Sequence, residues 1–135
     1  MKDTIRTEDI SGHITILCRE RGKNWEVLVD KKNALVPNAA LIIASALAGD
    51  TGWVIDNIRA YKASAPLAAS TTTFSYPAPG KVKFETIFSF SSFNDTLDEL
   101  RLLSATGGDF SVVTGLSVNK PNTLELSVQW VLTVI

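Results

Sequence analysis

The sequence is short of cysteine, of histidine and of long apolar runs. Its single cysteine excludes an internal disulfide and every zinc motif that needs several cysteines. The most apolar stretch, Ala39–Leu47, is far shorter than the ~20 residues of a membrane-spanning helix. Residues 1–11 are polar and of mixed charge, without the apolar core of a secretory signal. We therefore expect a soluble protein with no disulfide, no metal, no cofactor and no membrane partner.

Charge is also scarce over most of the chain. The formal net charge is −1, which argues against a nucleic-acid partner. Thirteen of the 27 charged side chains lie within residues 1–32. The remaining residues are roughly 14% charged, against a typical value of about 25%. A surface so poor in charge favours a subunit that is covered by copies of itself or by a larger assembly.

The 135 residues are enough for one domain with a core of its own. Residues 1–11 lack any apolar period and are predicted to form a flexible N-terminal arm. Residues 12–135 are predicted to form a single β-sandwich domain.

The strongest pattern lies in Lys81–Leu103. Phe84, Phe88 and Phe90 share one parity with Val82 and Thr86, which is typical of a half-buried strand. Small and polar residues follow at 91–95, and a second alternating segment runs to Leu103. The pattern predicts two strands joined by a β-hairpin or by a longer connection that turns a corner.

Other alternating segments predict further strands. Residues 14–18 and 25–29 flank a turn at Gly22 and are predicted to form a hairpin. Residues 53–61 and 110–117 are predicted strands, and 63–80 is predicted to be a long loop or an extended edge. The final strand, Leu124–Ile135, is too long and apolar for an open edge. We expect it to be central or paired with a neighbouring subunit.

One helix is predicted over residues 38–48. Pro37 precedes it and Gly49 follows it, as helix ends prefer. Its residues are apolar on nearly all sides, so we expect it to be buried. The predicted fold class is mainly β, an antiparallel β-sandwich of jelly-roll or Greek-key type with one short buried helix.

No residue pattern indicates catalysis. His13 and Cys18 are at odd separation in one predicted strand, so they point to opposite faces. Glu85 and Glu99 could form a glycosidase pair across a hairpin, but two surface carboxylates explain them better. Gly107-Gly108 precedes a strand and not a helix, which excludes a phosphate-binding loop. We expect no enzyme activity and no catalytic residue.

The chain from Asn33 to Ile135 resembles a group of small bacteriophage virion proteins, among them tail-fibre-like and capsid-associated proteins. The resemblance rests on the order of four motifs. They are the Asn33–Val36 start before an apolar helix ending in Gly49, the strand Ile55–Tyr61, the pair Val82–Phe84 and Asp98–Leu102, and Lys120 before Leu126–Leu132. Where many relatives have Gly-x-Gly after the first strand, this chain has Tyr61–Ser64.

The resemblance implies a non-enzymatic virion structural protein, assembled in the cytoplasm of a host bacterium. It would be a capsid decoration, head-fibre or tail-associated subunit. Its partners would be itself, as a homotrimer, and other virion proteins such as the major capsid or tail proteins. The alternative is a carbohydrate-binding, receptor-binding β-sandwich that uses loop aromatics.

Four residues are candidates for subunit contacts. Val131 and Ile135 place apolar side chains on the face of the last strand that should be polar in a monomer. Trp53 and Tyr76 lie in segments predicted to be exposed. The two aromatic residues are also the candidates for stacking on a sugar in the carbohydrate-binding alternative.

Overall fold

The computed structural model describes residues 10–50, 53–69, 71–104, 106 and 108–134. The protein is mainly β, with several antiparallel sheets and one short helix in these residues. The elements are β1 (Ile10–Glu20), β2 (Glu26–Asn33), α1 (Ala39–Leu47), β3 (Asn57–Lys62), β4 (Ala65–Ala69), β5 (Thr72–Ser75), β6 (Lys81–Phe88), β7 (Asp95–Leu97), β8 (Glu99–Ser104), β9 (Gly108–Val113), β10 (Val118–Lys120) and β11 (Leu124–Val134).

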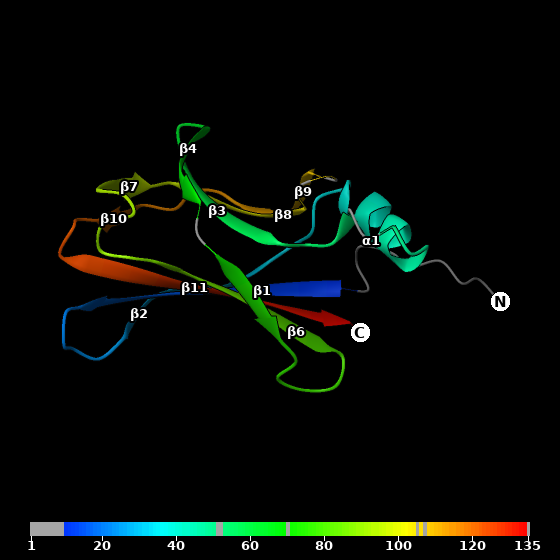
Figure 1. Cartoon of the computed structure of the whole chain (residues 1–135), viewed down its shortest axis with the longest axis horizontal. Helices are drawn as coiled ribbons and strands as arrows, with labels where there is room; N and C mark the ends of the chain where they lie inside the picture. The colour runs from blue at the N-terminus through cyan, green and yellow to red at the C-terminus, as the bar shows by residue number, and fades with distance from the viewer. Residues whose placement is uncertain (1–9, 51–52, 70, 105, 107, 135) are drawn as a thin grey trace.

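Two larger sheets form the two layers seen in Figure 1. A five-stranded sheet has the order β2-β1-β11-β6-β5, and a four-stranded sheet has the order β4-β3-β8-β9. A small sheet of β10 and β7 lies at the end of the molecule away from α1 (Figure 1). The prediction of a mainly β, antiparallel fold is confirmed, and the jelly-roll or Greek-key type stays a prediction.

The core lies between the two layers. Phe84, Phe88 and Trp130 of the five-stranded sheet are 7%, 0% and 0% exposed, as their parity in the sequence predicts. They belong to one apolar cluster with residues of the four-stranded sheet, such as Leu102 and Phe110. Alternation of side chains along each strand therefore selects the buried face.

The connection after β6 turns a corner and is not a hairpin. β6 pairs with β11 and β5 in one sheet, whereas β8 pairs with β3 and β9 in the other. Lys120 stabilises the turn, because its buried Nζ donates hydrogen bonds to the carbonyl oxygens of Phe90 (3.0 Å) and Phe93 (2.8 Å). Of the two connections that the sequence allows, the structure has the longer one.

Other strand predictions agree with the structure only in part. β1 and β2 form the expected hairpin, and β11 is central, between β1 and β6. Residues 63–80 contribute β4 and β5, which are edge strands of the two larger sheets. The strand expected over 53–61 begins only at Asn57.

The prediction of a buried helix is wrong. α1 lies at one end of the two layers, beside β9, and not between them (Figure 1). Only Ala39 and Ile42 are buried, whereas Leu41 and Leu47 are 54% and 70% exposed. The helix is apolar on nearly all sides, but the sheets cover only one of its faces.

The predicted arm falls mostly outside the described residues, which begin at Ile10. Ile10 and Ser11, its last two residues, are part of β1 and pair with Val134 and Thr133 of β11.

Candidate functional site

An apolar groove opens between α1 and the β5 edge of the five-stranded sheet. We call it the helix groove; its volume is about 390 Å³. Twelve of the described residues line it, from α1, the segment before β3, the β5–β6 region and β9: Ile42, Ile43, Ala46, Leu47, Trp53, Val54, Ile55, Phe74, Tyr76, Val82, Phe84 and Phe110. The groove reaches the core, because its lining includes the buried side chains of Ile42, Phe84 and Phe110.

The groove exists because one edge of the core is left open. Phe74 of β5 pairs with Phe84 of β6, so both side chains lie on the same face of the sheet. Phe84 is 7% exposed but Phe74 is 63% exposed. The opposite layer therefore covers β6 but does not extend over β5, and α1 closes the gap only in part.

The rim of the groove is both exposed and apolar. Leu47, Val54, Phe74 and Tyr76 are 70%, 50%, 63% and 75% exposed. The rings of Phe74 and Tyr76 meet edge to face, with their centroids 5.8 Å apart. Several large apolar side chains exposed around one groove are typical of an interaction surface, whereas single exposed ones are ordinary.

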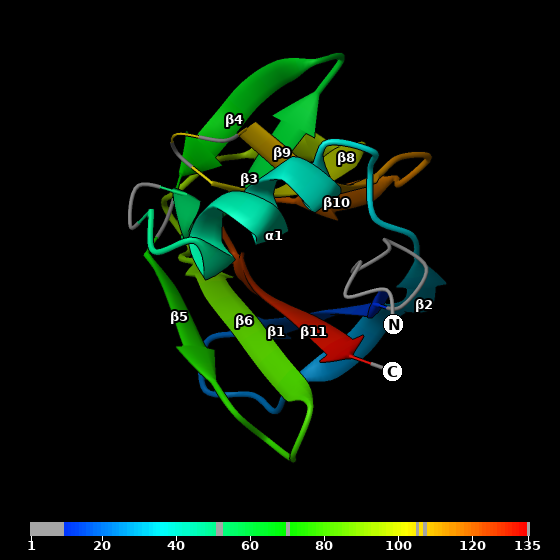
Figure 2. The same ribbon diagram turned by 90° about the vertical axis from the view of Figure 1, so that its right-hand side faces the viewer.

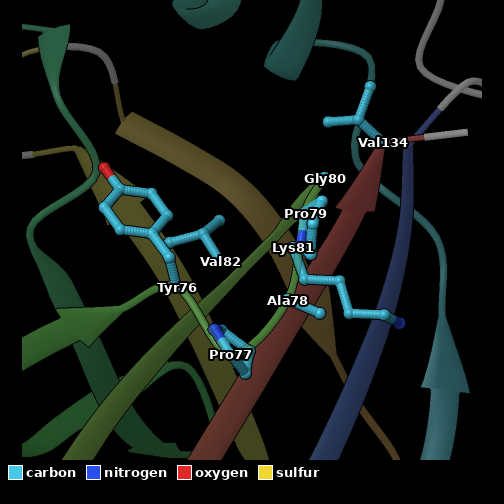
Figure 3. Close-up of a pocket in the computed structure, with 8 residues that line it drawn as sticks. All are labelled: Tyr76, Pro77, Ala78, Pro79, Gly80, Lys81, Val82 and Val134. Atoms are coloured by element: carbon cyan, nitrogen blue, oxygen red, sulfur yellow. The ribbon is translucent and has the colours of Figure 1, made fainter.

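A second pocket adjoins the groove at Tyr76 and Val82, which line both. We call it the proline pocket; it has a volume of about 610 Å³ and is lined by residues 76–82 and Val134. Figure 3 shows this loop beside Val134 at the end of β11. The backbone N–H of Val134 donates a hydrogen bond to the carbonyl oxygen of Gly80 (2.8 Å), which ties the loop to the sheet. Gly80 has a φ of +75°, a conformation that favours glycine.

The two pockets contain little charge. Among the described residues, none that lines the helix groove is charged, and Lys81 is the one charged residue that lines the proline pocket. Lys81 Nζ donates a hydrogen bond to Thr133 Oγ1 (3.1 Å) and so lies along the sheet. Such a surface binds an apolar partner by excluding water and offers few groups that would orient a polar ligand.

The structure brings together two of the four predicted contact residues. Trp53 and Tyr76 both line the helix groove, although Trp53 is half-buried and packs on the core. Val131 is elsewhere, half-buried on the outer face of β11 between His13 and Lys83. Ile135 lies outside the described residues.

Sequence reasoning missed Phe74, Leu47 and Val134. Phe74 belongs to a short strand within a Thr-rich segment, whose composition predicts a loop or edge. Leu47 belongs to the helix that the sequence predicts to be buried. The sequence offers one signal for this site. Two aromatic residues and a valine, Phe74, Tyr76 and Val82, surround a turn with two prolines, and this segment is unusually apolar for a loop.

The residues considered for catalysis are held in other contacts. His13 Nε2 hydrogen-bonds Asp30 Oδ1 on the outer face of the five-stranded sheet, and this bond lowers the pKa of the Asp30 carboxyl. Cys18 is buried on the opposite face of β1. Burial raises the pKa of the Cys18 thiol, and the charges of Glu26 and Glu20 add to this effect.

Glu85 and Glu99 lie in different sheets. Glu85 Oε2 accepts hydrogen bonds from Gln129 (2.9 Å) and Ser127 (3.3 Å), and Glu99 forms an ion pair with Arg101. The described residues contain no group of three or more side chains that could hold a metal ion. They also contain no helix long and apolar enough to cross a membrane.

Comparisons of this chain with protein-family models, with curated protein sequences and with solved structures found no match.

Proposed function

We propose that this chain is a non-enzymatic structural subunit of a bacteriophage virion. It would act by self-association and by docking on the particle, as a capsid decoration, head-fibre or tail-associated protein. The resemblance in sequence motifs supplies the class of protein. In this proposal the two layers are a β-sandwich of jelly-roll or Greek-key type that serves as a stiff body.

The exposed apolar rim of the helix groove is the observation that carries the proposal. A small protein that exposes Leu47, Val54, Phe74 and Tyr76 together gains free energy by burying them against a partner. The low charge after residue 32 supports the same conclusion, since a surface that meets other subunits needs less charge than one that meets water.

A non-enzymatic role agrees with the arrangement of the polar side chains. His13 is engaged by Asp30, and the carboxylates of Glu85 and Glu99 are on separate sheets. The partners we propose are further copies of the chain, in a homotrimer, and other virion proteins such as the major capsid or tail proteins.

The second candidate is a carbohydrate-binding module. The exposed ring of Tyr76, together with Phe74 and Trp53, favours this alternative, because aromatic rings stack on sugars. The described part of the groove lining contains no charged residue, which disfavours this role, since sugar hydroxyls need several hydrogen-bonding groups around them. A glycan array with the purified protein distinguishes the two: specific binding that is lost in Tyr76→Ala would favour the carbohydrate-binding role.

The decisive experiment for the virion role is a search for this chain in purified particles. We expect electron cryo-microscopy to show density that fits its two-layer fold at regular positions on the particle. A Phe74→Glu variant should be incorporated less than a Leu41→Glu variant, which places the same charge on an exposed residue outside the groove lining. Absence of the chain from particles of a phage that expresses it would refute the proposal.

A further inference from the structure

The five-stranded sheet ends in two open edges that both carry exposed apolar side chains. β2 and β5 are its edge strands, and Figure 2 shows them on opposite sides of the sheet. Each edge strand presents a row of backbone N–H and C=O groups, and no strand among the described residues lies beyond it in this sheet. A further strand can pair with either edge.

The β5 edge adjoins the helix groove. Phe74 belongs to β5, and Tyr76 is the first residue after this strand. Both residues line the groove. A strand that pairs with β5 would therefore place its own side chains over the groove rim. No charged residue occurs in β5 or among the described residues that line the groove, so the side chains that such a strand places over the groove must be apolar.

The β2 edge supplies such a segment. Val27 and Leu28 are 59% and 47% exposed, and a β-bulge presents Leu28: Ile16 pairs with Val29 and Leu17 with Val27, so that Leu28 is an extra residue. Charges on an edge strand hinder pairing; in β2 the first half has one charged residue, Glu26 at its start, whereas Asp30, Lys31 and Lys32 all lie in the second half. The more apolar first half, Glu26–Val29, has four residues, and so does β5.

The other sheet offers poorer edges. β4 contains Pro66, which has no N–H to donate to a ladder. β9 contains Asp109, and Leu35 already bridges it at Ser111.

We propose that the first half of β2 in one copy pairs with β5 of the next copy, so that Val27 and Leu28 cover Phe74 and the rim of the helix groove. This inference rests on the proposed function, of which it specifies the contact. The two surfaces differ, so the contact is heterologous and joins copies head to tail. Such a contact closes into a ring when the rotation permits, and a ring of three is the homotrimer expected above.

The test exploits the two different surfaces. Val27→Glu alters only the β2 surface, Phe74→Glu alters only the β5 surface, and Leu41→Glu is the control on an exposed α1 residue. All three side chains are at least half exposed, and circular dichroism and melting curves verify that each variant is folded. Light scattering measures the mass of each protein and of the mixture of Val27→Glu with Phe74→Glu, all at the same micromolar concentration.

We expect the natural chain and Leu41→Glu to have a mass several times that of one chain, 14.6 kDa. Val27→Glu and Phe74→Glu should each have the mass of one chain. An equimolar mixture of the two should contain a species of twice that mass, because each variant keeps the surface that the other has lost.

A mixture that stays at the mass of one chain would overturn the head-to-tail contact. An associated Val27→Glu variant would overturn the role of β2 while leaving self-association intact. A natural chain that is monomeric would refute both this inference and the proposed self-association.

Discussion

At the scale of single residues, Lys120 is the most unusual side chain. It is fully buried, with two backbone carbonyls as acceptors and its Nζ 5.2 Å from the centre of the Phe93 ring. We expect Lys120→Met to lower the free energy of unfolding by about 1–3 kcal/mol, because the carbonyl oxygens of Phe90 and Phe93 lose their donor. Urea denaturation measures the change, with the exposed Lys32→Met as the control; equal effects of the two substitutions would contradict this role.

The same lysine predicts a dependence on pH. Burial lowers the pKa of Lys120 below its usual value, and the charge of Glu125 opposes this in part. Between the folded pKa and the unfolded pKa of 10.5, the unfolded chain binds more protons, so the folded state gains stability as the pH rises. The free energy of unfolding of the natural protein relative to Lys120→Met should therefore increase as the pH rises through the lowered pKa towards 10.5. If the difference in unfolding free energy between the two proteins does not change with pH, Lys120 is equally protonated in the folded and unfolded states.

Two aromatic core residues provide a test of the strand faces. Phe88 and Trp130 are fully buried, and the Phe88 and Phe93 rings pack edge to face with centroids 5.5 Å apart. Phe88→Ala or Trp130→Ala should lower the free energy of unfolding by about 3–5 kcal/mol, because each leaves a cavity. Phe74→Ala, at a residue 63% exposed, should cost much less. Losses below about 1 kcal/mol at Phe88 and Trp130 would mean that these faces are not the core.

At the scale of elements, the β3–β4 turn carries backbone strain. Ala63 and Ser64 have φ angles of +48° and +65°, which residues other than glycine and asparagine rarely adopt. The turn is held by Asp98, whose Oδ2 accepts a hydrogen bond from the Ala63 N–H (2.9 Å). An asparagine followed by a glycine at these two positions would keep that N–H and suit two left-handed conformations.

We therefore expect the double substitution Ala63→Asn with Ser64→Gly to raise the free energy of unfolding by about 1 kcal/mol. Chemical denaturation measures it, and Ala65→Gly at the start of β4 is the control that should not stabilise the protein. A loss of stability in the double variant would show that the turn does not need these angles.

At the scale of the whole molecule, self-association links stability to concentration. If copies bind one another only when folded, mass action stabilises the folded state as the concentration rises. The melting temperature of the natural chain should rise as its concentration is raised, and that of Phe74→Glu should stay constant. Identical, concentration-independent melting of both proteins would contradict burial of the helix groove between copies.

The sequence by itself determined the longest strands and their buried faces. Alternation with a period of two is a local property, so the parity of Phe84 and Phe88, and of Trp130 in the last strand, identified the core before any fold was known. The β1–β2 hairpin and the ends of α1 were equally predictable, because Gly22, Pro37 and Gly49 act on the backbone next to them.

Only the tertiary structure decided which surfaces stay uncovered. α1 is apolar on nearly all sides, and its partial exposure depends on where the two sheets end, which its own residues do not encode. In the same way, Phe74 and Phe84 are the same residue type on the same sheet face, yet one is exposed and the other buried. The difference lies in the extent of the opposite sheet, a long-range property, and it is this difference that opens the helix groove.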